Sequence, residues 1–350
     1  MNFLHKIKFI AIIFVINTFL YANDTSTNLF LKDSLFNSNN YKAEGDSNLY
    51  LSPSEFTFAG KQKYTFNGEL PLKESKIRPL NFGILATATT TFFVSQHLYQ
   101  LSNIWKDKTE FRIIEDGPYG LYADKAGHCY GAYLNSYLYS ELLIWSGLSW
   151  DMAVISGTLL GLGYQFYVEI MDGYGKNWGF SPSDMYSNLT GALLNLGQHY
   201  IPFLQNFQMK FMYFPSDWHG ELKRQPSEFF IDDYSSQTFF VSIDIYNMLP
   251  SDMKKYWLPW LQLSIGYAAR NLVSPDYPRD PKKSFPYYGG EVFGSPRFIV
   301  ALDYDMVRLL PEGAGFWNWL RQSLNYIKFP APAIEFGETT RLFLLYPFHF

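Results

Sequence analysis

The stretch DMAVISGTLLGLGYQFYVEIMDGYGKNWGFSPSDMYSNLTGALLNLGQ, residues 151–198, predicts two helices joined by a compact loop. Residues 151–171 are mostly apolar or small, which is typical of a buried helix. Ser181, Pro182 and Ser183 supply the start signals of the second helix. The loop between them, 172–184, combines glycines with Trp178 and Phe180, and we expect it to cover one end of the helices.

Two similar stretches precede this pair of helices. Residues 79–105 form a continuous run of apolar and small residues, long enough for a helix that is buried or crosses a membrane. Residues 124–145 form another such run, rich in aromatic side chains. The sequence therefore predicts a helical domain over residues 79–205.

After about residue 205 the hydrophobic period changes from helical to two. In NFQMKFMY, Phe207, Met209 and Phe211 alternate with polar residues, as expected of a strand with one apolar face. Three later segments repeat the pattern, and the chain ends in the alternating stretch RLFLLYPFHF. We expect residues 206–350 to be an antiparallel β-rich region with one short helix.

The terminal Phe350 resembles the C-terminal signature of bacterial outer-membrane barrel proteins. A single-chain bacterial barrel needs at least about eight strands, and only five segments are clear. Three more would have to come from NLYLS, EFTFAG and KYTFNG. We therefore predict an α+β fold, a helical bundle of about four or five helices with an antiparallel β-sheet that is open. A partial or full barrel is the alternative.

The N-terminus predicts export. Lys6 and Lys8 precede an apolar run that ends near Ala22, as in a secretory signal peptide over residues 1–22, although Leu20 leaves an uncleaved anchor as the alternative. Residues 23–78 are rich in polar residues and predict an extended N-terminal segment with two or three short strands. The only cysteine, Cys129, is far from the cleavage point, so we expect neither an N-terminal lipid anchor nor an internal disulfide.

The composition favours a lipid or protein partner. Aromatic residues make up 19% of the chain and charged residues 17%, where soluble domains carry about 25% charged residues. The 32 acidic residues outnumber the 28 basic ones and no basic run is present, which argues against nucleic acid as a partner. We expect a membrane lipid or another envelope protein instead.

Each of the last three predicted helices carries a stripe of polar side chains flanked by glycine or alanine. Because small residues let helices approach closely, we expect the stripes to face one another as a polar core. The spacing alone directs Lys125 away from its stripe, although its charge makes it a partner for the buried carboxylates. The stripes are Asp124, His128 and Asn135; Gln165, Glu169 and Asp172; and Asp184, Asn188 and Asn195.

Several roles fit these residues. His128, Glu169 and Asp172 are the candidate catalytic residues if the protein is an enzyme, since two carboxyl groups one turn apart can raise a pKa. Structural roles compete: Asp124 as a helix cap, Asp184 as a first-turn carboxylate, His128 as a hydrogen-bonded core residue. No cofactor is favoured; a divalent metal would have the ligands Asp124, His128, Glu169 and Asp184.

The segments DKAGH and GLGYQFYVEIMDGYGKNWGFSPSDMYSNLTGA resemble an uncharacterised bacterial family of predicted periplasmic lipoproteins, with short YfiM-like members. The order Asp-Lys-x-x-His, Glu, Ser-x-x-Asp-x-x-x-Asn-x-x-Gly is more distantly similar to the VanZ-like membrane family. The resemblance is strongest over residues 85–200. It extends to DDYSSQTFFVSIDIY and LNYIKFPAPAIEF, and so covers the chain from about residue 80 onward. The matching positions are Asp124, Lys125, His128, Glu169, Asp172, Gly173, Trp178, Ser181, Asp184, Asn188 and Gly191.

The resemblance implies a location and a residue set but no reaction. We therefore expect a structural or interaction protein of the cell envelope, in the periplasm and associated with the outer membrane, without the lipobox cysteine of a lipoprotein. One alternative is a hydrolase that uses acid–base or metal-assisted chemistry on an envelope lipid or glycan. The other is an outer-membrane β-barrel with a packed helical domain.

Overall fold

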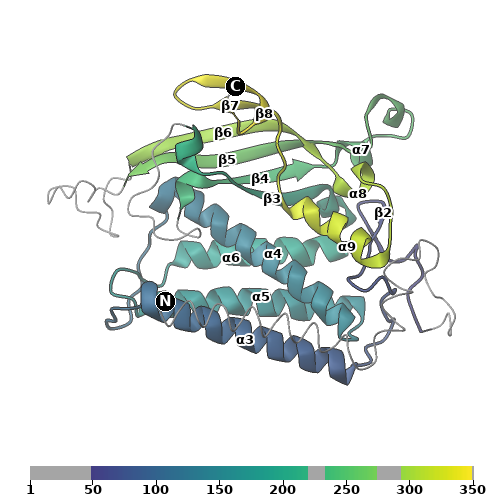
Figure 1. The fold of residues 1–350 in the computed structure, drawn as a ribbon, viewed down its shortest axis with the longest axis horizontal. Helices are drawn as coiled ribbons and strands as arrows, with labels where there is room; N and C mark the ends of the chain where they lie inside the picture. Colours follow the sequence, from purple (N-terminus) through teal and green to yellow (C-terminus); the bar gives the residue numbers. More distant parts are fainter. Residues whose placement is uncertain (1–48, 220–232, 274–292, 349–350) are drawn as a thin grey trace.

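A computed structural model describes residues 49–219, 233–273 and 293–348 of the protein. The expected signal peptide, the first part of the N-terminal segment and Phe350 lie outside these ranges. The described residues form two layers, four long helices and a curved antiparallel sheet (Figure 1). The predicted α+β class, with a helical bundle and an antiparallel sheet from the C-terminal half, is confirmed.

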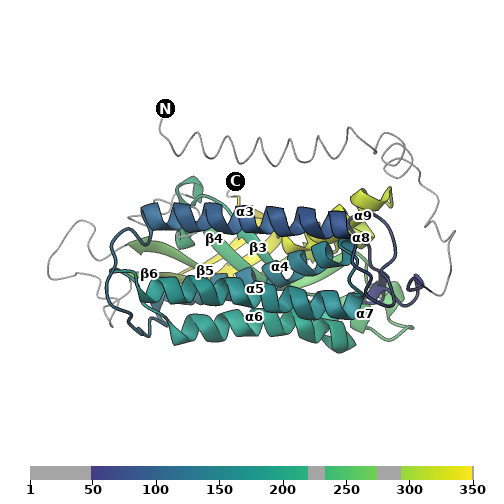
Figure 2. The ribbon, with the colours of Figure 1, turned by 90° about the horizontal axis from the view of Figure 1, so that it is seen from below.

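The helical layer is built around its second helix. This helix, α4, packs against α5 and α6 on one side and against strands of the sheet on the other, while α3 lies along the edge of the layer (Figure 2). In the described ranges, no helix combines the length and the apolarity needed to cross a membrane. The four helices are α3 (Pro79–Asn103), α4 (Ala123–Trp145), α5 (Trp150–Gly173) and α6 (Pro182–Tyr200).

The predicted close approach of these helices at small residues is confirmed. A Cβ atom on Gly191 of α6 would overlap the carbonyl oxygen of Cys129 in α4. A Cβ atom on Gly161 of α5 would lie 2.8 Å from the backbone nitrogen of Ser136 in α4. Glycine at these positions therefore sets the spacing of the polar faces that the helices turn toward one another.

Six strands form one antiparallel sheet in the order β3-β4-β5-β6-β7-β8. In the described residues this sheet is open, because β3 and β8 are its two ends and do not pair with each other. The full-barrel alternative is therefore wrong for these strands. The strands are β3 (Phe207–Tyr213), β4 (Gln237–Ile243), β5 (Leu261–Val273), β6 (Phe293–Tyr304), β7 (Ala331–Phe336) and β8 (Thr340–Tyr346).

The N-terminal segment does not extend this sheet. Its strands β1 (Thr57–Phe58) and β2 (Lys61–Gln62) form a separate two-stranded hairpin. Within the described part of the C-terminal region there are three helices where one was expected: α7 (Ile245–Met248), α8 (Met306–Leu309) and α9 (Gly315–Ser323). The sequence does not predict α7 and α8, because each is a single turn at the end of a strand, too short for a helical pattern to stand out from the alternating pattern of that strand.

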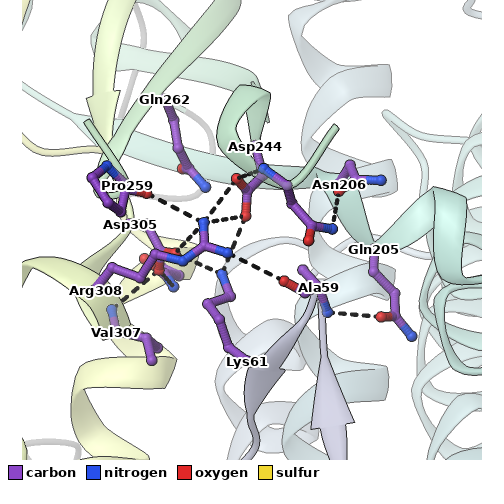
Figure 3. A network of polar contacts seen from close by, with 12 residues as sticks. Ala59, Lys61, Gln205, Asn206, Asp244, Pro259, Gln262, Asp305, Val307 and Arg308 are labelled. Atoms are coloured by element: carbon purple, nitrogen blue, oxygen red, sulfur yellow. Dashed lines mark hydrogen bonds and ion pairs between the residues drawn. The ribbon is translucent and has the colours of Figure 1, made fainter. Parts of the chain in front are cut away.

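A buried ionic network fastens the β1–β2 hairpin to the ends of β4 and β6 (Figure 3). Lys61 Nζ lies 2.7 Å from Asp305 Oδ2 and 3.5 Å from Asp244 Oδ2. Arg308 donates to both carboxylate oxygens of Asp244 at 2.9 Å. Each aspartate also accepts a backbone N–H at the start of its short helix, α7 or α8. Two strand ends and the hairpin are thus held at one point.

The sheet curves so strongly that side chains from distant strands meet on its inner face. Phe240 of β4 and Tyr346 of β8 have ring centroids 6.2 Å apart, although three strands lie between them in the sheet order. Both belong to one buried cluster with Ile299 and Phe343. The charged groups of the sheet are buried on this face too, and Lys210 Nζ lies 3.0 Å from Asp303 Oδ2.

Replacing Gly191 by alanine should destabilise the protein by about 1–3 kcal/mol, because the new Cβ forces the α4 backbone away from α6. Gly163 of α5 is the matched control: a Cβ there meets nothing within 4 Å, so Gly163→Ala should stabilise the helix by about 0.5–1 kcal/mol. Urea unfolding of both variants measures the two free energies. A Gly191→Ala protein as stable as wild type would contradict the close helix contact.

Candidate functional site

A left-handed turn leads directly into the polar end of α4. Gly120, Leu121 and Tyr122 have φ values of 56°, 52° and 67°, a conformation that costs about 1–2 kcal/mol for a non-glycine residue. The turn is held by the Tyr267 hydroxyl, which donates to the Leu121 carbonyl oxygen. Asp124 is not the helix cap considered from the sequence; the cap residue is Tyr122, and Asp124 lies in the first turn.

Lys125 is the centre of an ionic cluster, which we call the Lys125 cluster. Its Nζ lies 2.6 Å from Asp116 Oδ1, 2.6 Å from Asp124 Oδ2 and 2.5 Å from Asp184 Oδ1. The helical spacing directed Lys125 away from the polar stripe, but its long, flexible side chain reaches the carboxylates at the helix N-terminus. One ammonium group is therefore shared by carboxylates from the turn before α4, from α4 and from α6.

His128 lies between carboxylates from all three helices. Its Nε2 is 3.6 Å from Asp124 Oδ1 and 3.7 Å from Asp184 Oδ1. Its Nδ1 is 3.5 Å from Glu169 Oε1 and 3.2 Å from Asn188 Oδ1. The side chain of His128 is 18% exposed, whereas that of Glu169 is 2% exposed. The imidazole is thus the most accessible of these groups.

The other predicted core residues lie outside this cluster. Asp172 accepts a hydrogen bond of 2.6 Å from Trp105 Nε1, away from the Lys125 ammonium. Asn195 donates to the Thr158 hydroxyl at 3.2 Å. Gln165 lies against Gly131 on the neighbouring helix. Asn135, which is half-buried, has no hydrogen bond to the cluster among the described contacts. The stripes therefore meet at only one end of the helices.

Three members of the cluster come from positions that the helical stripes do not include. Asp116 contacts Lys125, the Tyr234 hydroxyl donates to Asp124 Oδ1, and Ser181 Oγ donates to Asp116 Oδ1 at 2.6 Å. The backbone N–H of Ser181 also donates to Glu169 Oε2 at 3.2 Å. Helical periodicity cannot find Asp116 or Tyr234, because Asp116 lies outside the helices and Tyr234 begins a single 3₁₀ turn (Tyr234–Ser236).

Burial and charge separate the pKa values of the carboxyl groups. Burial raises the pKa of Asp124, but His128 and Lys125 lower it more, so its pKa is well below the usual value. Burial raises the pKa of Asp184, and neighbouring Asp124 adds to the shift. Burial likewise raises the pKa of Glu169 despite the opposing effect of His128. The site therefore contains carboxyl groups that differ in protonation near neutral pH.

Asp172 forms a separate titrating group beside the cluster. Its burial raises its pKa to about 7, against the opposing hydrogen bond from Trp105. The pKa of Asp172 is thus higher in the folded state than in the unfolded state. Such a group contributes stability when the pH is below its unfolded-state pKa, and this contribution is lost as the pH rises through its folded-state pKa.

A cavity of about 60 Å³ lies elsewhere, at the opposite end of α4. It is lined by Tyr137, Glu141 and Gln198, among others, and by no member of the Lys125 cluster. Glu141 there pairs with Lys63 and accepts a hydrogen bond of 3.1 Å from Trp319 Nε1. The Lys125 cluster and this cavity are therefore two distinct features of the helical layer.

Asp172 should make the protein less stable as pH rises from about 4 to about 7, because the folded state holds a proton that the unfolded state releases. Asp172→Asn keeps an oxygen acceptor for Trp105 but cannot titrate. Between pH 5 and pH 7 the wild type should therefore lose more stability than the variant, by about 3 kcal/mol or less. Denaturant unfolding at both pH values in EDTA measures this difference, and equal losses would contradict the assignment.

Comparison of the chain with known proteins gives a match to one family model. Neither the curated proteins nor the solved structures contain a match to the chain. Residues 114–196, which span α4, α5, the loop after it and most of α6, match the model of a family described as "Predicted periplasmic lipoprotein (DUF2279)". The helical core that holds the Lys125 cluster is therefore similar to a family of predicted periplasmic lipoproteins, which supports export of this chain to the periplasm.

Proposed function

We propose that the protein is an envelope interaction protein that docks on a membrane lipid surface through the outer face of strands β5–β8. The observation that carries this proposal is the distribution of side chains across the sheet: exposed apolar residues cover the outer face of β5–β8, and the charged residues are buried on the inner face. Export to the periplasm, supported by the family match, gives the protein access to such a surface.

The outer face of β5–β8 is an exposed apolar surface. Ile265, Val300, Ile334 and Leu342 are paired across the four strands, so their side chains form a continuous row. Leu342 is 80% exposed and Ile265 is 57% exposed. Contiguous apolar surface of this kind marks an interaction site on a soluble protein.

The inner face buries the charged side chains of the sheet. On β5 and β6, the residues that alternate with the exposed apolar ones include Arg270, Arg297 and Asp303, which are at most 4% exposed. Buried charged side chains therefore share the inside of the curved sheet with the apolar cluster around Phe240 and Ile299, while Phe298 and Val300 of β6 face outward. Strands that face lipid have this alternation, because lipid tails exclude charged side chains.

A basic and aromatic loop lies directly before β5 in the chain. It joins α7 to β5 and contains Lys254 and Lys255 beside exposed Tyr256 and Leu258. Lys255 Nζ lies 4.9 Å from the ring centroid of Tyr256. Lysine and aromatic side chains at the edge of an apolar surface suit the boundary between lipid head groups and tails, especially with anionic lipid.

We infer further that this lipid belongs to the outer membrane. The inference rests on β8, where Leu342 and Leu344 face outward and Phe343 is buried, as in the terminal strands of outer-membrane proteins. We also propose that the chain is related to the YfiM-like and, more distantly, the VanZ-like proteins. This part of the proposal rests on the order of residues in the helical cluster.

A second candidate function is acid–base hydrolysis of an envelope lipid or glycan. The observation that favours it is the position of His128, which lies between Glu169 and the two aspartates Asp124 and Asp184. A histidine among carboxyl groups of unequal pKa can transfer protons.

Vesicle flotation tests the docking surface. The full chain should float with vesicles of phosphatidylethanolamine and phosphatidylglycerol at 3:1, and less with phosphatidylcholine alone. The double variant Leu342→Thr, Leu344→Thr should lose most of this binding, because it removes exposed apolar area while threonine keeps the strand preference.

The matched control is Leu159→Gln with Leu193→Gln, two exposed leucines of the helical layer. This variant should float like wild type, since glutamine keeps the helical preference. Circular dichroism confirms that each variant is folded. Failure of the wild type to float, or equal loss in the control, would overturn docking through the sheet.

A further inference from the structure

The Lys125 cluster contains more negative than positive charge. Asp116, Asp124, Glu169 and Asp184 carry four negative charges when ionised, whereas Lys125 and a protonated His128 carry two positive charges. Asp124, Glu169 and Asp184 are each at most 4% exposed. Because buried charge without compensation costs several kcal/mol, the ionised cluster requires about two further positive charges.

The spacing around His128 Nε2 fits a bound cation better than hydrogen bonds. The distances of 3.6 Å to Asp124 Oδ1 and 3.7 Å to Asp184 Oδ1 exceed those of hydrogen bonds. Two ligands that each lie about 2.1 Å from one ion are separated by roughly 3.4 Å in a tetrahedral site. One ligand atom from each of Asp124, His128 and Asp184 lies within 4.8 Å of the others.

The other side of the imidazole has the surroundings of a metal-bound histidine. Nδ1 faces Asn188 Oδ1 at 3.2 Å and Glu169 Oε1 at 3.5 Å. A ligating histidine usually donates this second N–H to a carboxylate or amide oxygen, which fixes the ring. Glu169 Oε1 is buried, points at the ring and accepts no hydrogen bond. This orphaned oxygen is explained if His128 donates to it when Nε2 holds an ion.

Lys125 leaves part of the site available. It bonds Asp124 through Oδ2, while Oδ1 faces His128 and accepts a hydrogen bond from the Tyr234 hydroxyl. At Asp184 the same oxygen, Oδ1, lies 2.5 Å from Lys125 Nζ and 3.7 Å from His128 Nε2. A cation would therefore compete with the ammonium group only at Asp184.

We propose that Asp124, His128 and Asp184 bind one divalent first-row cation of the zinc or manganese class, with Glu169 and Asn188 orienting the imidazole. Two carboxylate oxygens and one imidazole nitrogen are the donor set that such borderline ions accept. Three protein ligands leave a coordination position for water or for a ligand group. This site is independent of the lipid-docking face.

The test uses the full chain, purified without a polyhistidine tag, stripped with EDTA, and titrated with ZnCl₂ and MnCl₂ at pH 7. Calorimetry and ICP-MS after desalting should give one ion per chain. His128→Gln and Asp184→Asn should not retain a stoichiometric ion, and Glu169→Gln should bind about 10- to 100-fold more weakly. His199→Gln is the matched control, because His199 pairs with Asp151 outside the cluster at 2.5 Å, and it should bind like wild type.

A second measurement needs no variant. Co²⁺ added to the stripped wild-type protein should give the visible absorption of a low-symmetry site, and Zn²⁺ should displace it. The absence of a stoichiometric ion in wild type would overturn the proposal and leave the cluster balanced by protons. Binding by folded His128→Gln and Asp184→Asn at wild-type affinity would also overturn it, because the ion would then be held elsewhere.

Discussion

The shared ammonium group of Lys125 is the interaction on which the polar core depends. It contacts Asp116, Asp124 and Asp184 within 2.6 Å, and so joins the turn before α4, α4 itself and α6. These buried carboxylates would repel one another without it, and removing one partner of a buried ionic cluster is strongly destabilising. The positions of Ser181, Glu169 and His128 follow, because each is bound to a carboxylate of the cluster or lies beside one.

The sheet obeys a different constraint. Its strands curve until β4 and β8 pack on the same inner cluster, so the inner face excludes water and must satisfy its own charges. Lys210 does so with Asp303, and also donates to the Tyr304 carbonyl oxygen at 2.8 Å. The apolar side chains then point outward, where α4 packs against β3, β4 and part of β5, while Ile265, Val300 and Leu342 remain exposed. The exposed apolar face of β5–β8, which we propose as a docking surface, therefore follows from the alternation that buries the charged side chains on the inner face.

Much of the polar site followed from helical spacing. Asp124, His128, Glu169, Asp184 and Asn188 were expected on facing stripes, and the structure brings these five together. Asn135 and Gln165 share the same stripes but lie further along helices whose polar residues meet only at one end. Periodicity gives the face of a helix on which a residue lies, but it does not give the position along the axis at which two helices meet.

The sequence by itself determined the four helices, the change to alternating strands after residue 205 and the small residues at the helix contacts. These are local properties, since periodicity and start signals act within a few residues. Only the tertiary structure decided that Asp116 and Tyr234 join the cluster, that Lys125 turns back to it, and that the hairpin β1–β2 stays outside the sheet. Tyr234 and Asp124 are 110 residues apart, and such a contact depends on how the curved sheet packs on α4, which no local pattern encodes.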